Sequence, residues 1–172
     1  AELAIRYFSS HGPAQVIDLC WWTGLTKKEA ETAIEAAGRK LVREVVEGKT
    51  YYMDTSLKET SKPSETVYLL PPFDELLVGY KDRSASLEAI HAMHVNPGAN
   101  GMFSGIVVID GQVIGTWKRT LKKDSVEVTT KPFKSFTAKQ KDAIAETDEK
   151  YELFLDLHSG VQASDFASIQ EM

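Results

Sequence analysis

The feature that most constrains the fold is a series of three short helical patterns within the first 38 residues, each followed by a glycine. The first pattern ends at Gly12-Pro13, because proline cannot easily continue a helix. The second ends at Gly24, where a left-handed residue is favoured, and the third ends at Gly38. In each pattern the apolar residues recur with helical spacing. They are Leu3, Ala4, Tyr7 and Phe8 in the first helix, Val16, Leu19, Cys20 and Trp22 in the second, and Ala30, Ala33, Ile34 and Ala37 in the third. The sequence therefore predicts three short helices around one core, which we expect to include Trp21, Trp22, Leu19, Ile34 and Tyr7.

A hairpin pattern follows the third helix directly. Thr26 and Glu29 have the spacing of a capping box, which marks the start of that helix. Leu41–Val46 and Thr50–Met53 are rich in branched and aromatic residues and are separated by a turn that contains glycine. Three helices and a terminal hairpin are typical of a winged helix-turn-helix, with the third helix in the recognition position. We therefore assign residues 1–53 to a winged helix.

The rest of the chain has mainly β-type patterns. Residues 54–66 are polar and contain a proline, which is typical of a linker. The final helix is expected to begin with a second capping box, formed by Thr137 and Gln140. The predicted strands and helices after the linker are Val67–Leu70, Phe73–Tyr80, Ala85–His94, Phe103–Ile109, Gln112–Leu121, Ser125–Lys131 and Thr137–Leu157. We expect an α+β protein in which residues 67–172 form a small antiparallel β-barrel-like domain with a C-terminal helix.

Composition narrows the classes of protein. The one cysteine, Cys20, cannot form an internal disulfide, and no Cys or His cluster has zinc spacing. His91 and His94 could share a helix face, but no third metal ligand is evident. No apolar run approaches the roughly 18 residues that a membrane span needs. We expect a cytoplasmic protein without a membrane partner, metal or cofactor. Because the chain starts at Ala1 and not at a methionine, we also expect it to be part of a longer chain.

One basic segment stands out although the net charge is −5. Residues 115–141 contain eight Lys or Arg and two Asp or Glu, whereas residues 54–114 and 142–172 are acidic. Within it, the strand Gly115–Lys123 is the strongest candidate for binding double-stranded DNA. Trp117 offers a stacking surface, and basic side chains neutralise phosphates; these side chains are Lys118, Arg119, Lys122 and Lys123.

Strand alternation limits how these side chains act together. It places Trp117 and Arg119 on one face of the strand and Lys118 on the other. The alternative is that Trp117 belongs to the core and that the lysines only keep an edge strand from pairing.

Two other charged segments are further candidates for DNA contact. Lys81 and Arg83 lie close in sequence to the acidic residues Asp74, Glu75 and Asp82, and such a cluster could line a channel or form a solvated turn.

Lys27 and Lys28 lie on the outer face of the third helix with Thr26 and Thr32, where a recognition helix contacts DNA. Glu31 and Glu35 share that surface and would repel phosphates. The alternative for this helix is a solvated face that packs against a neighbouring unit.

Three stretches resemble one known family, and they are FSSHGPAQVIDLCWWTGLTKKEA (Phe8–Ala30), LLPPFDELLVGYKDR (Leu69–Arg83) and FSGIVVIDGQVIGTWKRTL (Phe103–Leu121). In this order they resemble the winged-helix DNA-binding family that includes the bacterial AlkZ-like DNA glycosylases, which unhook alkylated bases and crosslinks. The resemblance extends from about Leu3 to Leu157. It implies the last winged helix and the β-barrel of a longer protein, in which other winged-helix units precede this part and a basic DNA channel is enclosed.

The resemblance also bears on catalysis. Glycosylase members of that family carry a Gln-x-Gln or Gln-x-Asp pair in a more N-terminal unit. Here only Gln140 has a matching partner, Asp142, and this pair begins the final helix, where the family does not place its site. The resemblance therefore implies no catalytic residue in this chain.

The leading prediction is a DNA-binding protein or fragment, the C-terminal part of an AlkZ-like winged-helix protein, that grips duplex DNA without chemistry of its own. A second reading is the substrate-gripping part of a DNA glycosylase that acts on alkylated or crosslinked bases. A third is a protein–protein scaffold, since a fold alone does not decide function.

Overall fold

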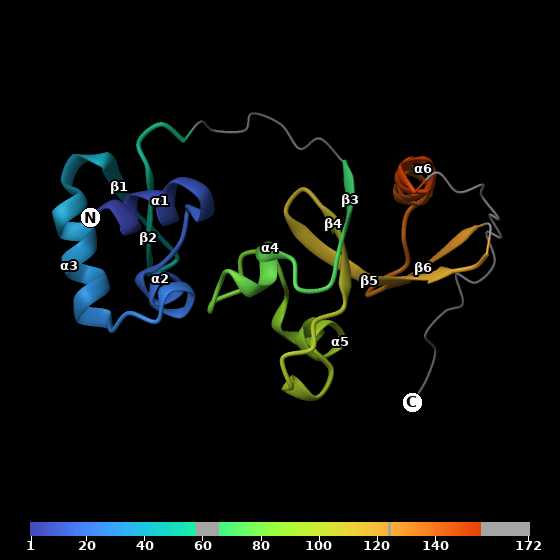
Figure 1. Cartoon of the computed structure of the whole chain (residues 1–172), viewed down its shortest axis with the longest axis horizontal. Coiled ribbons are helices and arrows are strands. Elements are labelled where there is room, and N and C mark those ends of the chain that lie inside the picture. Colours follow the sequence, from blue (N-terminus) through green and yellow to red (C-terminus); the bar gives the residue numbers. More distant parts are fainter. Residues whose placement is uncertain (58–65, 124, 156–172) are drawn as a thin grey trace. The chain divides into compact units, whose positions relative to one another are not determined.

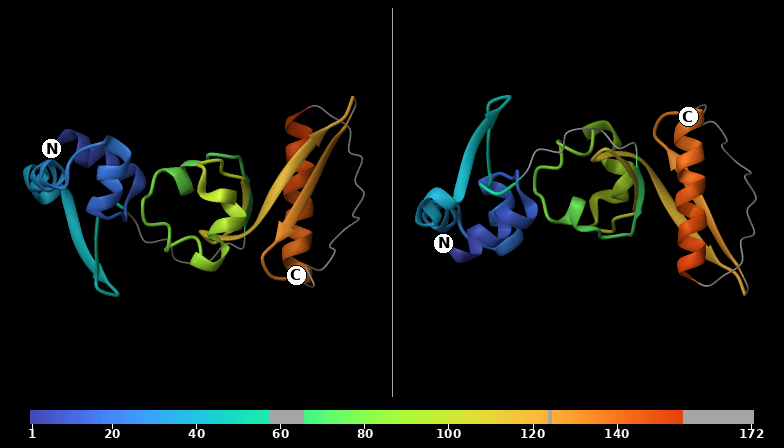
Figure 2. Two further views of the ribbon diagram at one scale, coloured as in Figure 1. Left: turned by 90° about the horizontal axis from the view of Figure 1, so that it is seen from below. Right: turned by 90° about the horizontal axis from the view of Figure 1, so that it is seen from above.

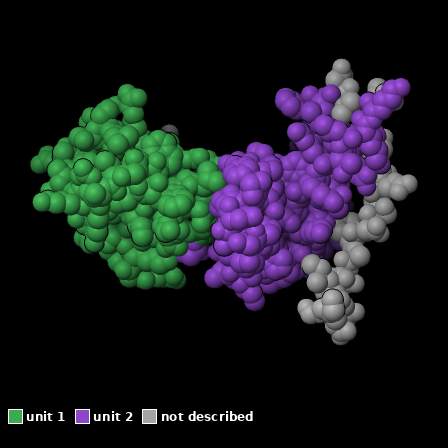
Figure 3. Space-filling view, turned by 60° about the horizontal axis from the view of Figure 1, so that its bottom comes forward, with its two compact units in different colours: residues 1–61, 75–83 green, residues 62–74, 84–172 purple. Residues whose placement is uncertain are grey.

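The computed structural model describes residues 1–57, 66–123 and 125–155 (Figure 1). The chain forms two compact units, which Figure 3 shows in green and purple. Unit 1 contains residues 1–61 and 75–83, and unit 2 contains residues 62–74 and 84–172. The segment Glu75–Arg83 therefore packs with the N-terminal residues, although the sequence assigned it to the C-terminal domain.

Unit 1 contains the three predicted helices and the predicted hairpin. The helices are α1 (Glu2–His11), α2 (Val16–Thr23) and α3 (Lys27–Ala37), followed by the short 3₁₀ helix η1 (Gly38–Lys40). The strands β1 (Leu41–Val46) and β2 (Lys49–Asp54) pair antiparallel. Ala14, between α1 and α2, pairs with Tyr52 in an isolated antiparallel bridge and so ties the helices to the hairpin.

Local sequence signals set the ends of these helices. Thr26 and Glu29 form the expected capping box at the start of α3. Gly24 ends α2 in the left-handed conformation, with a φ of 75°. The core between the helices is apolar and fully or nearly fully buried, and it consists of Ala4, Tyr7, Phe8, Ala14, Leu19, Ala30 and Ile34.

The prediction that Trp21 and Trp22 belong to this core is wrong. Their side chains are 51% and 47% exposed, whereas Leu19 on the same helix is fully buried. Each indole N–H donates a hydrogen bond to the segment 75–83. An indole needs a partner for its N–H, and a place at the edge of the core supplies one without burying the whole ring.

Unit 2 is built on one four-stranded antiparallel sheet with the order β3-β4-β5-β6. The strands are β3 (Val67–Leu70), β4 (Gly105–Ile109), β5 (Gln112–Leu121) and β6 (Val126–Pro132). A register shift between Val107 and Val108 marks a bulge in the pairing of β4 with β5.

Four short helices lie between β3 and β4 in the sequence. α4 (Glu75–Val78) lies in the segment 75–83, and η2 (Ala89–His91), α5 (Ala92–Val95) and η3 (Pro97–Ala99) precede β4. The single helix expected over Ala85–His94 is therefore restricted to its second half, because the first residues of that segment form turns and bends.

The sheet is open within the described residues, so the expected barrel-like closure is wrong. The edge strands β3 and β6 are not paired with each other there. Four strands are too few to enclose an interior wide enough for side chains. The long helix α6 (Ala138–Phe154) packs on one face instead (Figure 2), over a core of Val67, Val107, Phe136 and Ile144.

Across the described ranges, no helix combines the length and the apolar character needed to cross a membrane.

Candidate nucleic-acid interface

Trp117 of the basic strand is held in place by the sheet and by α6. Its indole Nε1 donates a 2.7 Å hydrogen bond to the backbone oxygen of Leu70. Its ring meets the ring of Tyr151 edge-on, with centroids 5.7 Å apart. Gly105 lies directly across from it in β4, and a Cβ at that glycine would be only 2.8 Å from the indole Nε1. Trp117 is therefore a packed, half-buried side chain with limited freedom to move toward a base.

Arg119 lies on the same face of β5 as Trp117, as strand alternation requires. Its Nη1 donates to the hydroxyl of Tyr151, and its guanidinium carbon lies 6.0 Å from the centroid of that ring. Arg119 thus bridges the sheet to α6 while it stays exposed.

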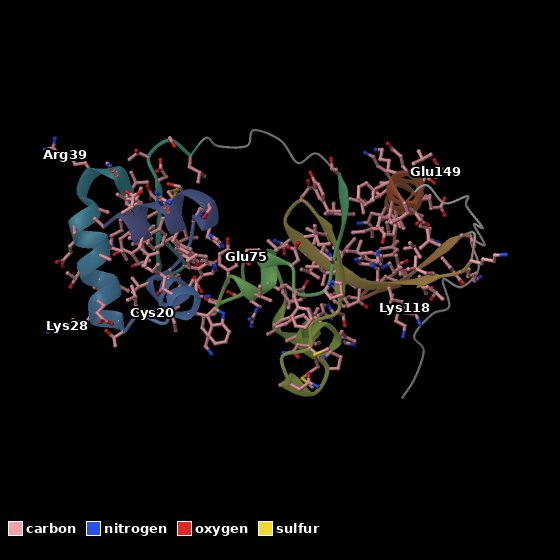
Figure 4. The ribbon with its side chains drawn as sticks, in the orientation of Figure 1. Cys20, Lys28, Arg39, Glu75, Lys118 and Glu149 are labelled. Carbon is pink, nitrogen blue, oxygen red and sulfur yellow. The ribbon has the colours of Figure 1, made fainter. Side chains whose placement is uncertain are left out.

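Three lysines predicted to contact DNA, Lys118 in β5 and Lys122 and Lys123 just beyond it, differ in their surroundings. Lys118 is exposed and points to the side of the sheet away from α6 (Figure 4). Lys122 forms an ion pair of 2.9 Å with Glu127 of β6. Lys123 is exposed just beyond the end of β5. Within the described part of the chain, Lys118 and Lys123 have no carboxylate partner, so their charges are available to an anion.

A pocket of about 590 Å³ opens on the face of the sheet that α6 leaves uncovered. Its floor comes from neighbouring positions of β5 and β6: Thr116 pairs with Lys131, and Lys118 pairs with Thr129. All four of these residues line the pocket. Two hydroxyls and two ammonium groups therefore share one surface.

The rest of the pocket is mostly apolar or aromatic. Its other lining residues are Met93, His94, Pro97, Ser104, Trp117, Pro132 and Phe133. The Phe133 ring is stacked on His91, with centroids 4.2 Å apart and planes 18° apart, and it lies 5.5 Å from the ring of His94.

Sequence patterns did not identify Lys131, His94 or Phe133 as site residues. Lys131 was counted in the basic segment, but its place beside Lys118 depends on the register between β5 and β6. A hairpin register counted back from the turn after Leu121 could have indicated this pairing.

The acidic and basic residues of the segment 75–83 are bound within unit 1. Glu75, labelled in Figure 4, has its Oε1 2.8 Å from Nε2 of His11 and 2.7 Å from Nε1 of Trp22. The hydrogen bond with His11 lowers the pKa of Glu75, and the bond from Trp22 acts in the same direction.

Asp18 fixes the end of the same segment. Its buried carboxylate accepts hydrogen bonds of 2.9 Å from the backbone N–H groups of Gln15, Lys81 and Asp82. The carboxylate of Asp82 in turn accepts bonds of 2.7 Å from Lys49 and from the side chain of Gln15. These contacts hold residues 81 and 82 against the start of α2.

The two basic residues predicted here also face unit 1. The ammonium of Lys81 lies 4.7 Å from the centroid of the Trp21 ring, and the Nε of Arg83 donates to the backbone oxygen of Leu77. Burial lowers the pKa of Arg83. The arrangement is a docked segment with satisfied polar groups.

Lys27 and Lys28 are exposed on α3. Lys27 lies 3.7 Å from Glu31 one turn later, which partly offsets its charge. Within the described residues, no group of three or more His, Cys, Asp or Glu side chains is placed to hold a metal ion.

Comparison with protein-family models matches residues 1–154 to the family described as DNA glycosylase AlkZ-like. Among solved structures, the chain is similar to the DNA glycosylase AlkZ of Streptomyces sahachiroi, with 25% identical residues and a TM-score of 0.66. That similarity covers 84% of this chain and 41% of the other chain, so this chain spans less than half the length of that glycosylase. No curated protein matches the sequence.

Proposed function

Because this chain belongs to the AlkZ-like DNA glycosylase family, we propose that it serves DNA repair by gripping duplex DNA through the basic strand β5 and the residues just beyond it. The observation that carries this proposal is the pair of exposed lysines, Lys118 and Lys123, which have no carboxylate partner in the described residues. Exposed lysines on a strand and just beyond its end attract the phosphate backbone of any sequence.

The other predicted contacts in and just beyond β5 are expected to contribute less to duplex affinity. Arg119 already donates to Tyr151, and Lys122 already pairs with Glu127. Each must give up or share its partner before it meets a phosphate. Trp117 acts by holding the strand in place rather than by stacking on a base, since its indole is bonded to Leu70.

We also infer that α1–α3 with the hairpin β1–β2 form a winged helix. The short bridge between Ala14 and Tyr52 supports this inference, because it adds a strand-like residue between the first two helices to the sheet of the wing. The third helix is a weaker DNA contact in this proposal, because Glu31 and Glu35 share the outer face of Lys27 and Lys28.

A salt titration of duplex affinity tests the proposal. Removing the charges in a Lys118→Gln, Lys123→Gln double variant should weaken binding to every duplex about equally. It should also lower the slope of log affinity against log salt by roughly 0.9 for each phosphate that the protein no longer neutralises. The matched control, Lys27→Gln with Lys28→Gln, should change the slope less. The reverse ranking would move the contact to α3, and no duplex binding by the original chain would favour a protein–protein scaffold.

A second candidate function is the DNA-gripping part of a glycosylase, and it is supported by the similarity to AlkZ over 41% of that enzyme. In this reading the chemistry belongs to residues outside this chain. The purified chain should then release no methylated base from duplex DNA, whereas a longer protein that contains it should. Base release by the 172-residue chain itself would contradict both candidates.

A further inference from the structure

The pocket on the uncovered face of the sheet combines the groups that recognise a nucleotide. We propose that it binds one unpaired nucleotide, with the phosphate between Lys118 and Lys131 and the base against Phe133 and His94. The inference rests on the proposed function in one respect, because DNA that follows β5 passes the mouth of this pocket. The inference adds a second ligand, an unpaired nucleotide, which a base-paired duplex does not present.

The charged half of the pocket favours an anion. Lys118 and Lys131 occupy diagonal positions of one sheet face, where Cβ atoms lie about 7–8 Å apart. Neither lysine has a carboxylate partner in the parts of the chain that the structure describes. Two like charges on neighbouring positions repel each other until an anion lies between them. A phosphate group fits this place, and the hydroxyls of Thr116 and Thr129 on the same floor can donate to its oxygens.

The other half of the pocket offers an aromatic and apolar wall. Phe133 is held by its stacking on His91, and His94 lies beside it. Met93, which also lines the pocket, is 59% exposed, so its apolar side chain is accessible to a ligand. Bases stack on such rings whatever their sequence.

The size of the pocket fits one nucleotide better than a helix of DNA. About 590 Å³ lies within the range of about 300–1,000 Å³ that is usual for small-molecule sites. A paired base cannot reach such a concave site while it stays stacked, so the nucleotide must come from a single strand, a flipped position or free solution.

Calorimetric titration of the full chain tests the proposal with dAMP, deoxyadenosine, inorganic phosphate and the single strand d(A)4 as probes. We expect dAMP to bind at least tenfold more tightly than deoxyadenosine or phosphate. Lys131→Gln should weaken dAMP binding about tenfold, as the removal of one charge-assisted hydrogen bond would. Phe133→Leu should weaken dAMP and deoxyadenosine but leave phosphate unchanged. Lys134→Gln, which removes an exposed lysine outside the pocket, should have no effect.

The source of the nucleotide follows from the same titrations. Tighter binding of d(A)4 than of dAMP would assign the pocket to a single strand, and equal affinity would assign it to a free nucleotide. Binding of neither, or equally weakened binding in Lys131→Gln and Lys134→Gln, would overturn the inference. Duplex salt dependence, measured on the same samples, keeps the two proposals apart. If the slope of log duplex affinity against log salt changes as proposed but dAMP does not bind, only the pocket assignment fails. If dAMP binds but the duplex does not, only the duplex proposal fails.

Discussion

His11 and Glu75 are 64 positions apart in the sequence, yet Nε2 of His11 lies 2.8 Å from Oε1 of Glu75. His11 ends α1, and its ring is stacked on that of Tyr7 at a centroid distance of 4.6 Å. The contact therefore joins the first helix of unit 1 to the start of the returning segment 75–83.

Replacement of Glu75 by glutamine should make the stability of the protein depend less on pH under acidic conditions. The His11 hydrogen bond lowers the pKa of Glu75 below its ordinary value of 4.5 in the folded state. A lowered folded pKa contributes stability that is present above pH 4.5 and is lost as the pH falls through the folded value. We expect Glu75→Gln to have a lower thermal midpoint than the original chain at pH 6 and to approach it as the pH falls through the lowered folded pKa of Glu75.

Glu35→Gln is the matched control for this experiment, because Glu35 is an exposed glutamate of unit 1 outside the contact with the returning segment. A difference between Glu75→Gln and the original chain that does not change with pH would show that the charge of Glu75 has no part in it.

Leu19→Ala should destabilise unit 1 by about 2–5 kcal/mol, because Leu19 is fully buried and its removal leaves a cavity. Trp21→Phe should cost only about 0.5–1.5 kcal/mol, the usual net value of one hydrogen bond, since the ring is half exposed and mainly loses its bond to Val78. Urea unfolding followed by circular dichroism measures both. An equal cost for the two variants would contradict this ranking of core against edge.

Gly105→Ala should disturb unit 2 through Trp117. A Cβ at Gly105 would lie 2.8 Å from the indole Nε1 and 3.0 Å from the backbone oxygen of Trp117, and neither can yield without breaking the bond to Leu70 or the pairing of β4 with β5. Overpacking of this kind costs about 1–3 kcal/mol. The NMR signal of the Trp117 indole proton should shift and the thermal midpoint of unit 2 should fall. Gly111→Ala is not a suitable control because of its positive φ, but Ser104→Ala beside the same strand is.

Asp148→Asn should stabilise the protein above about pH 6. Burial raises the pKa of Asp148 from 3.8 to about 6, and the neighbouring carboxylates Glu152 and Glu149 add to this effect. The charged form is thus disfavoured by folding, so the original chain loses stability as the pH rises from about 4 to about 6. The variant does not lose stability in this way, and its advantage should vanish below pH 4. Thermal midpoints at pH 4 and pH 8 measure the gain in stability, and the exposed Asp142→Asn serves as control. An equal gain at both pH values would contradict the raised pKa of Asp148.

Local signals were sufficient for most helices and strands. The capping boxes at Thr26 and Thr137 and the spacing of apolar residues in α3 are determined by neighbouring residues alone, and the structure confirms them. The strand β5 was predicted with the bounds that the structure gives it.

Features that depend on distant partners were not predicted. The half-exposed state of Trp21 and Trp22 depends on acceptors at Val78 and Glu75, which lie 57 and 53 positions away. Apolar character alone would bury both rings. The nucleotide pocket likewise depends on the register that places Lys131 across from Thr116 and on the approach of His94.

The segment Glu75–Arg83 belongs to unit 1, although the ribosome synthesises it after β3 of unit 2. Domains tend to fold in the order of synthesis, N-terminal first. Here the partners of Asp18 and Trp21 emerge from the ribosome only after β3, whose own partner β4 comes later still. Unit 1 is therefore completed while the first strand of unit 2 is still unpaired, and a nascent chain halted between residues 61 and 75 would hold the three helices with no acceptor for the indoles of α2.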